Sequence, residues 1–133
     1  MEFNTQEKKA IVLAMKAMID ADNVRHPNEK LIYDCIYNSL NISYDESISI
    51  MAFVTDSYYN SDIVDQHLTI IANMDMDKKK DVISILTTLA AIDKNIDDRE
   101  NDLLTQYRIV CDLPYTKYSF LEAMQNAKKY IVK

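Results

Sequence analysis

The chain contains 133 residues, and none of them is glycine. Glycine supplies the positive φ angles of tight hairpin turns and the phosphate-cradling loops of many nucleotide-binding proteins. Its complete absence therefore argues against nucleotide-binding loops, tight hairpins and β-barrels. Helices joined by Asn and Asp turns remain compatible with this composition, so the sequence predicts an all-α fold.

Apolar residues recur at helical spacing along the chain, and no segment shows sustained strand alternation. Turn-prone residues, two prolines and two capping-box patterns divide the chain into about seven helices. The third helix should begin after Ser43, with Glu46 as its capping partner, and the sixth at Asp97, with Glu100. The expected helices cover 5–21, 27–40, 43–54, 63–71, 78–92, 97–111 and 118–127.

Length and charge restrict the class of protein. Residues 1–133 are expected to form a single helical domain, because their number is ordinary for one domain. The net charge of −6 disfavours a nucleic-acid partner, since phosphate contacts need an excess of Lys and Arg. The first residues lack a signal-peptide pattern, and no apolar run approaches the roughly 18 residues of a membrane span. We expect a cytoplasmic protein without membrane insertion.

Two halves of the chain, approximately 8–43 and 79–114, repeat one another at a spacing of 71 residues. Helical hairpins in one register predict pseudo-twofold packing, with the apolar first helix of each half meeting at the centre. The aligned pairs include Asp22 with Asp93, Glu29 with Glu100, Met15 with Leu86, and Met18 with Leu89.

The turn inside each hairpin carries a shared pattern, ADNVRHPNE over 21–29 and IDKNIDDRE over 92–100. These segments resemble the signature of the TerB-like family, named for the tellurite-resistance protein. In that family both halves carry Ala-Asp-Gly-x-Ile/Val-x-x-x-Glu. The present sequence departs from it at the glycine, replaced by Asn23 and Lys94, and at Arg25. The departures indicate a divergent member.

This resemblance implies a bundle of about seven helices in two pseudo-symmetric halves, a bacterial origin, and a link to tellurite or stress resistance. It implies no enzymatic activity, because members of the family are usually treated as interaction or metal-sensing modules. The acids of the paired loops are the family's suspected ion ligands. They correspond here to Asp22, Glu29, Asp93 and Glu100.

The second acidic loop also carries part of a calcium-binding pattern. Asp93, Asn95 and Asp97 place oxygen ligands on alternate residues, as such loops do. Asp98 and Leu104, however, occupy the positions of the required glycine and bidentate Glu. A divalent cation is the only cofactor suggested, with Asp22, Glu29, Asp93, Asp97 and Glu100 as ligands. The alternative is that Asp97 and Glu100 simply cap a helix.

No motif specifies a catalytic site. His26 and His67 lack the companions of a zinc site, and no nucleophile, His and Asp arrangement stands out. Tyr58 and Tyr59, expected in a connection, are the best-placed aromatic residues for a protein contact, unless they pack over helix ends.

The leading interpretation is a non-enzymatic interaction module with an unidentified protein partner. A divalent-cation-binding stress protein that uses the two acidic loops is the alternative. A third possibility, a small-ligand or enzyme domain, requires a concave polar pocket between the halves.

Overall fold

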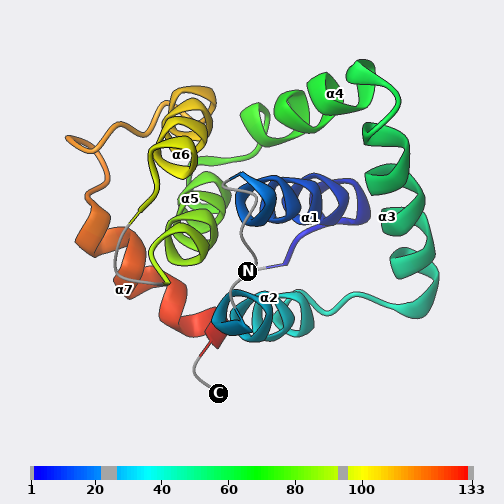
Figure 1. The fold of residues 1–133 in the computed structure, drawn as a ribbon, viewed down its shortest axis with the longest axis horizontal. Coiled ribbons are helices and arrows are strands. Elements are labelled where there is room, and N and C mark those ends of the chain that lie inside the picture. The colour runs from blue at the N-terminus through cyan, green and yellow to red at the C-terminus, as the bar shows by residue number, and fades with distance from the viewer. Residues whose placement is uncertain (1, 22–26, 93–95, 132–133) are drawn as a thin grey trace.

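A computed structural model describes residues 2–21, 27–92 and 96–131. These residues form seven α-helices and no strand, which confirms the predicted all-α fold (Figure 1). None of the helices in the described residues combines the length and apolar character needed to cross a membrane. The helices are α1 (Thr5–Asp20), α2 (Pro27–Ser39), α3 (Tyr44–Ser57), α4 (Ser61–Ala72), α5 (Met76–Ala90), α6 (Asp98–Val110) and α7 (Phe120–Ile131).

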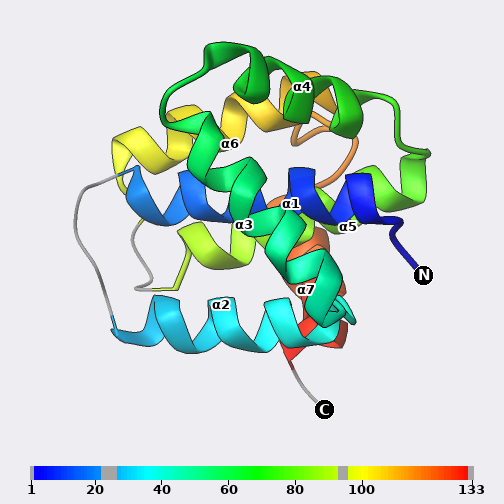
Figure 2. The same cartoon turned by 90° about the vertical axis from the view of Figure 1, so that its right-hand side faces the viewer.

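The helices are arranged around α1 and α5, which contact each other in the middle of the molecule (Figure 1). α3 and α4 pack on α1, α7 packs along α5, and α6 contacts α4 and α5. Figure 2 shows α3 crossing in front of α1, at the periphery of the molecule. Among the described helices α3 contacts only α1 and α4, so one side of α3 faces away from the fold.

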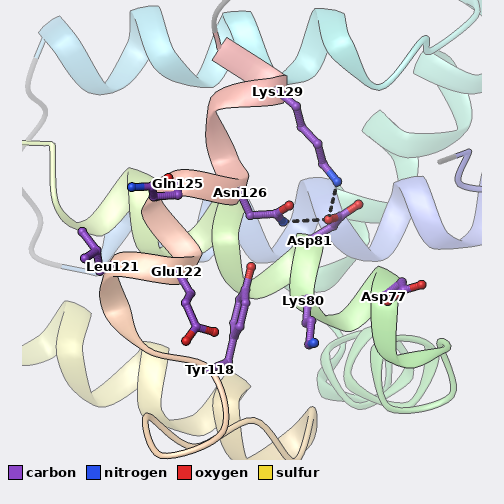
Figure 3. Close-up of a pocket in the computed structure, with 9 residues that line it drawn as sticks. All are labelled: Asp77, Lys80, Asp81, Tyr118, Leu121, Glu122, Gln125, Asn126 and Lys129. Atoms are coloured by element: carbon purple, nitrogen blue, oxygen red, sulfur yellow. Dashed lines mark hydrogen bonds and ion pairs between the residues drawn. The ribbon is translucent and has the colours of Figure 1, made fainter.

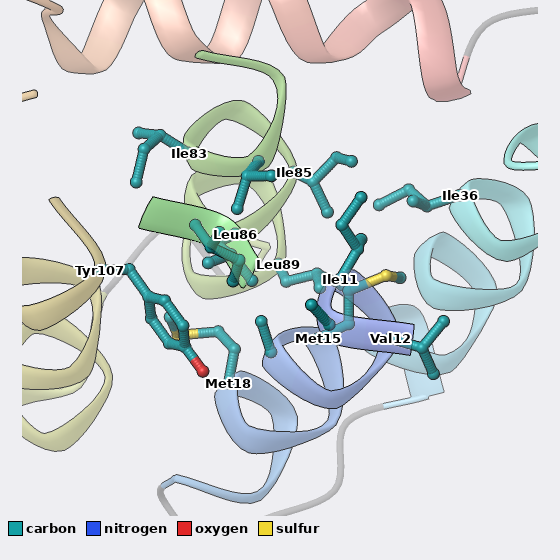
Figure 4. Packing of buried hydrophobic residues seen from close by; sticks show 14 of the residues in the cluster. Ile11, Val12, Met15, Met18, Ile36, Ile83, Ile85, Leu86, Leu89 and Tyr107 are labelled. Carbon is teal, nitrogen blue, oxygen red and sulfur yellow. The ribbon is translucent and has the colours of Figure 1, made fainter. Parts of the chain in front are cut away.

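Apolar side chains of α1 and α5 form the centre of the core (Figure 4). Met15 and Met18 of α1 and Leu86 and Leu89 of α5 are almost completely buried. Burying one side chain of this size contributes about 1.5–3 kcal/mol. The apolar first helix of each half therefore lies at the centre of the molecule, as the sequence predicted.

Capping side chains determine where the helices begin. Ser43 with Glu46 and Asp97 with Glu100 form the two predicted capping boxes, in which each side chain accepts a backbone N–H of the other residue. Asn4 and Glu7 form a third at the start of α1. Each box satisfies two backbone donors that the first turn leaves without a helical partner.

The first two helices of the halves follow the 71-residue spacing. The N-caps of α1 and α5, Asn4 and Asp75, are 71 residues apart. The first residues of α2 and α6 are also 71 residues apart, and so are their last residues. Glu7 and Lys78 occupy equivalent positions and pair with each other, with Nζ 2.9 Å from Oε1. Side chains at equivalent positions meet in this way when two similar helices pack about a pseudo-twofold axis.

Asn41 and Asp112, again 71 residues apart, both have φ of 54°, in the left-handed region. Glycine usually occupies this position after a helix, because a Cβ atom makes the left-handed conformation costly. Asn and Asp tolerate it best among the other residues. The Asn and Asp turns expected of a glycine-free chain therefore end α2 and α6.

Several helix boundaries differ from the sequence prediction, and these include the start of α4 at Ser61, the end of α5 at Ala90 and the end of α7 at Ile131. α3 continues to Ser57 instead of ending near Val54, because the next helix is capped only at Asn60. α5 begins at Met76, two residues early, since the Asp75 side chain accepts the Lys78 N–H. α7 begins at Phe120, where the Ser119 hydroxyl accepts the Glu122 N–H.

Candidate functional site

The predicted metal ligands are only partly described by the structure. Asp22 and Asp93 lie outside the described residues. Glu29 in α2 and Glu100 in α6 are buried, with 2% and 3% exposure, and Asp97 is the N-cap of α6. No group of three or more His, Cys, Asp or Glu side chains within 2–21, 27–92 and 96–131 could hold a metal ion.

Asp97 and Glu100 form the capping box that the sequence offered as the alternative to a cation site. The Asp97 carboxylate accepts the Arg99 backbone N–H at 2.8 Å, and this hydrogen bond lowers the pKa of Asp97 below its ordinary value. A carboxylate engaged by backbone donors is suited to holding a helix end. Cation binding by the paired loops stays a prediction.

The two predicted interaction residues, Tyr58 and Tyr59, lie at the C-terminal end of α3. Both side chains are exposed, Tyr58 to 67% and Tyr59 to 88%. An exposed tyrosine offers a large apolar ring and a hydroxyl at a low conformational cost. The tyrosines are therefore available for contact with another molecule.

Tyr58 also completes a row of exposed apolar side chains along α3. We call Tyr44, Ile48, Met51 and Tyr58 the α3 face; Tyr44 is 79% exposed and Met51 71%. Positions separated by four, three and seven residues lie on one side of a helix. Ile50 and Val54, about a quarter turn around the helix from this row, are buried in the core. The apolar part of the helix surface is thus wide, and the portion formed by the α3 face is left exposed.

A hollow of about 440 Å³ lies next to the α3 face, between α1, α2 and α3, and Met51 and Tyr58 form part of its wall. Tyr33 and Tyr37 of α2 stack on its other side, with ring centroids 6.1 Å apart. The Lys16 amine lies over the Tyr33 ring, 5.3 Å from its centroid. Burial raises the pKa of Tyr33 to about 12, so this phenol stays protonated at neutral pH.

A second hollow, of about 300 Å³, lies on the other side of Tyr58, between α1, α4 and α6. His67 and Tyr107 line it and are buried. Nδ1 of His67 contacts the Val64 carbonyl and must donate, so Nε2 accepts the Tyr107 hydroxyl at 2.8 Å. Burial lowers the pKa of His67, which favours this neutral ring.

A hollow with a largely polar lining and a volume of about 510 Å³ lies between α5 and α7 (Figure 3). Asp81, buried at its inner wall, accepts hydrogen bonds from Asn126, Lys129 and Tyr130 at 2.7–2.8 Å. The Ser84 hydroxyl bonds Asn126 and Tyr118. These hydrogen bonds join α5 to α7. They also engage both oxygens of the Asp81 carboxylate, so it is already occupied by partners from the chain.

The sequence prediction of an interaction site named Tyr58 and Tyr59 but did not include Tyr44, Ile48 and Met51 of the α3 face. The spacing of Tyr44, Ile48 and Met51 was visible in the sequence as a helical row. A second apolar row, containing Ile50 and Val54, runs along the same segment. Which row is buried depends on how α3 packs against α1, and this is a property of the fold.

These features define an all-α protein of seven described helices with one uncovered apolar helix face. Neither a protein-family model nor a curated protein sequence matches the chain.

The chain is similar to a protein of unknown function from Porphyromonas gingivalis W83, PG1108, which has a crystal structure. The two are 31% identical, with a TM-score of 0.71 over 96% of this chain and 98% of that one. The chain therefore belongs to the same family as PG1108. The TerB-like resemblance stays a prediction.

Proposed function

We propose that this chain is a helical interaction module that binds another protein through the α3 face. The observation that supports the proposal is the row of Tyr44, Ile48, Met51 and Tyr58, all exposed on a helix that, among the described helices, contacts only α1 and α4. Contiguous apolar side chains on a protein surface are characteristic of interaction sites. The hollow beside Met51 and Tyr58 adds a concave edge in which a partner side chain can be buried.

The partner is a different protein and not a second copy of this chain. α3 carries the exposed carboxylates of Asp45 and Asp56 and no Lys or Arg. Pairing α3 with α3 of a second copy would place these like charges near one another, which opposes association. No reaction is assigned to the module, and a link to tellurite or stress resistance stays a prediction of the TerB-like resemblance.

The proposal is tested by selecting helix-forming peptides from a randomised display library on the intact chain. The recovered peptides are then assayed on Ile48→Ser/Met51→Ser. Ile109→Ser/Leu121→Ser is the matched control, because both residues are apolar and exposed but lie on α6 and α7. We expect the α3 variant to lose at least tenfold in affinity, since burying each side chain is worth on the order of 1 kcal/mol or more.

Unchanged binding by Ile48→Ser/Met51→Ser would place the binding site elsewhere and contradict the proposal. So would a wild-type dimer in sedimentation equilibrium that the same variant converts to monomer, because a second copy would then cover the α3 face.

A further inference from the structure

The acidic charge of the chain is concentrated in one stretch that contains α3 and α4. Residues 31–77 carry eight Asp and Glu side chains and no Lys or Arg. The remaining residues carry 13 acidic and 15 basic side chains. The net charge of −6 therefore originates in 31–77, and the rest of the chain is slightly basic.

Within this stretch, the charges nearest the α3 face are exposed. Asp45 and Asp56, which are 11 residues apart on α3, lie on the same side of the helix, at one edge of the α3 face. Asp62 and Asp65, on the α4 helix that follows, are exposed as well. None of these four carboxylates has an ion pair within the part of the chain that the structure describes.

Glu46 differs from these four residues. Its carboxylate is held by the Thr5 hydroxyl and by Lys8, whose Nζ lies 3.0 Å from Oε1. Glu46 therefore fastens α3 to α1, and its charge is compensated inside the chain. Asp45 and Asp56, on α3 itself, have no such cation within the part of the chain that the structure describes.

We propose that the partner presents a basic amphipathic helix to the α3 face. This proposal rests on the proposed function and specifies the chemistry of the partner. The exposed row spans the 14-residue α3, about 21 Å, so a partner helix of about four turns matches its length. Apolar residues at helical spacing would cover Ile48 and Met51, and Lys or Arg on one flank would meet Asp45 and Asp56.

A helix suits this surface better than an extended peptide. An added strand needs an exposed row of backbone donors and acceptors, and the backbone of α3 is bonded within its own helix. Apolar rows of two helices can instead interdigitate, with a large partner side chain entering the hollow beside Met51 and Tyr58. Nucleic acid and anionic lipid surfaces are disfavoured, because phosphates repel the acidic edge.

The test uses three synthetic 18-residue helical peptides that share one apolar row. The polar positions carry Lys and Arg in the first peptide, uncharged Gln and Ser in the second, and Glu in the third. Each is titrated into the wild-type chain, into Asp45→Asn/Asp56→Asn, and into Asp102→Asn/Glu122→Gln. The last variant removes two exposed carboxylates from α6 and α7 and serves as the matched control.

We expect the basic peptide to bind about tenfold tighter than the uncharged one and to weaken as salt is raised. Asp45→Asn/Asp56→Asn should lose about fivefold to tenfold in affinity for the basic peptide, and the control should lose little. If all three peptides bound equally well, and Ile48→Ser/Met51→Ser abolished their binding, the proposal of a basic partner would be overturned but the proposed function would be retained. No binding of any peptide to the wild type would overturn both.

Discussion

Asp81 is the side chain whose removal should most clearly test how α7 is held against the central helix α5. Its carboxylate is 3% exposed and accepts hydrogen bonds from three residues of α7. Burial, followed by the hydrogen bond to Asp81, raises the pKa of Tyr130, so its phenol remains a proton donor. Asp81→Ala removes this carboxylate and leaves the buried Tyr130 hydroxyl without the acceptor of its hydrogen bond.

The expected loss follows from the exposure of each donor. An unsatisfied buried hydroxyl such as that of Tyr130 costs about 1–3 kcal/mol, and the lost Asn126 hydrogen bond about 1 kcal/mol. The Lys129 side chain is 47% exposed and can turn to water, so its ion pair contributes less than about 1 kcal/mol. Asp81→Ala should therefore destabilise the chain by about 3 kcal/mol, a large part of the 5–15 kcal/mol typical of a domain.

The assay is urea unfolding of the wild type, Asp81→Ala and Lys129→Met, followed by circular dichroism. Lys129→Met is the matched control, because it removes only the exposed partner and should cost less than about 1 kcal/mol. A loss below about 1 kcal/mol for Asp81→Ala, or equal losses for the two variants, would contradict the role given to the buried carboxylate.

Three further predictions concern single positions. Asn41→Ala should lose about 1 kcal/mol in urea unfolding and Asn41→Gly should not, because φ is 54° there; equal losses would refute a left-handed requirement. The folded-state pKa of His67 is lowered, so its stabilisation is present above the unfolded value of 6.5 and is lost as pH falls below it. His67→Gln should flatten the thermal stability between pH 7 and about 5, and an unchanged slope would argue against burial of the ring. The pKa of Glu46 is lowered to about 2, mainly by the Thr5 hydroxyl, so its contribution is lost between about pH 4.5 and 2. Glu46→Gln should remove the loss of stability between these pH values from the acid unfolding profile. If the profiles of the variant and the wild type were superimposable, Glu46 would not contribute to acid stability.

Much of the fold could be predicted from the sequence, because its signals are local. The absence of glycine, the capping boxes at Ser43 and Asp97, and the apolar periodicity are all contained within a few residues. The left-handed residues Asn41 and Asp112 fit the glycine-free composition, since Asn and Asp are the residues other than glycine that tolerate this conformation best.

The surface and the buried polar clusters could not be predicted, because they depend on contacts between distant segments. His67 and Tyr107 are 40 residues apart, and Asp81 and Tyr130 are 49 apart. Neither pair belongs to a sequence motif. The α3 face has the same limitation, because its two apolar rows look equivalent until α1 covers Ile50 and Val54.

The most direct test of the proposed function is to map, by amide chemical shifts, where the basic amphipathic peptide binds on the wild-type chain. We predict that the largest shifts cluster on α3 between Tyr44 and Tyr58, with smaller ones at the hollow lined by Tyr33 and Tyr37. Shifts concentrated instead between α5 and α7, around Asp81, or spread evenly over the acidic surface, would contradict binding through the α3 face.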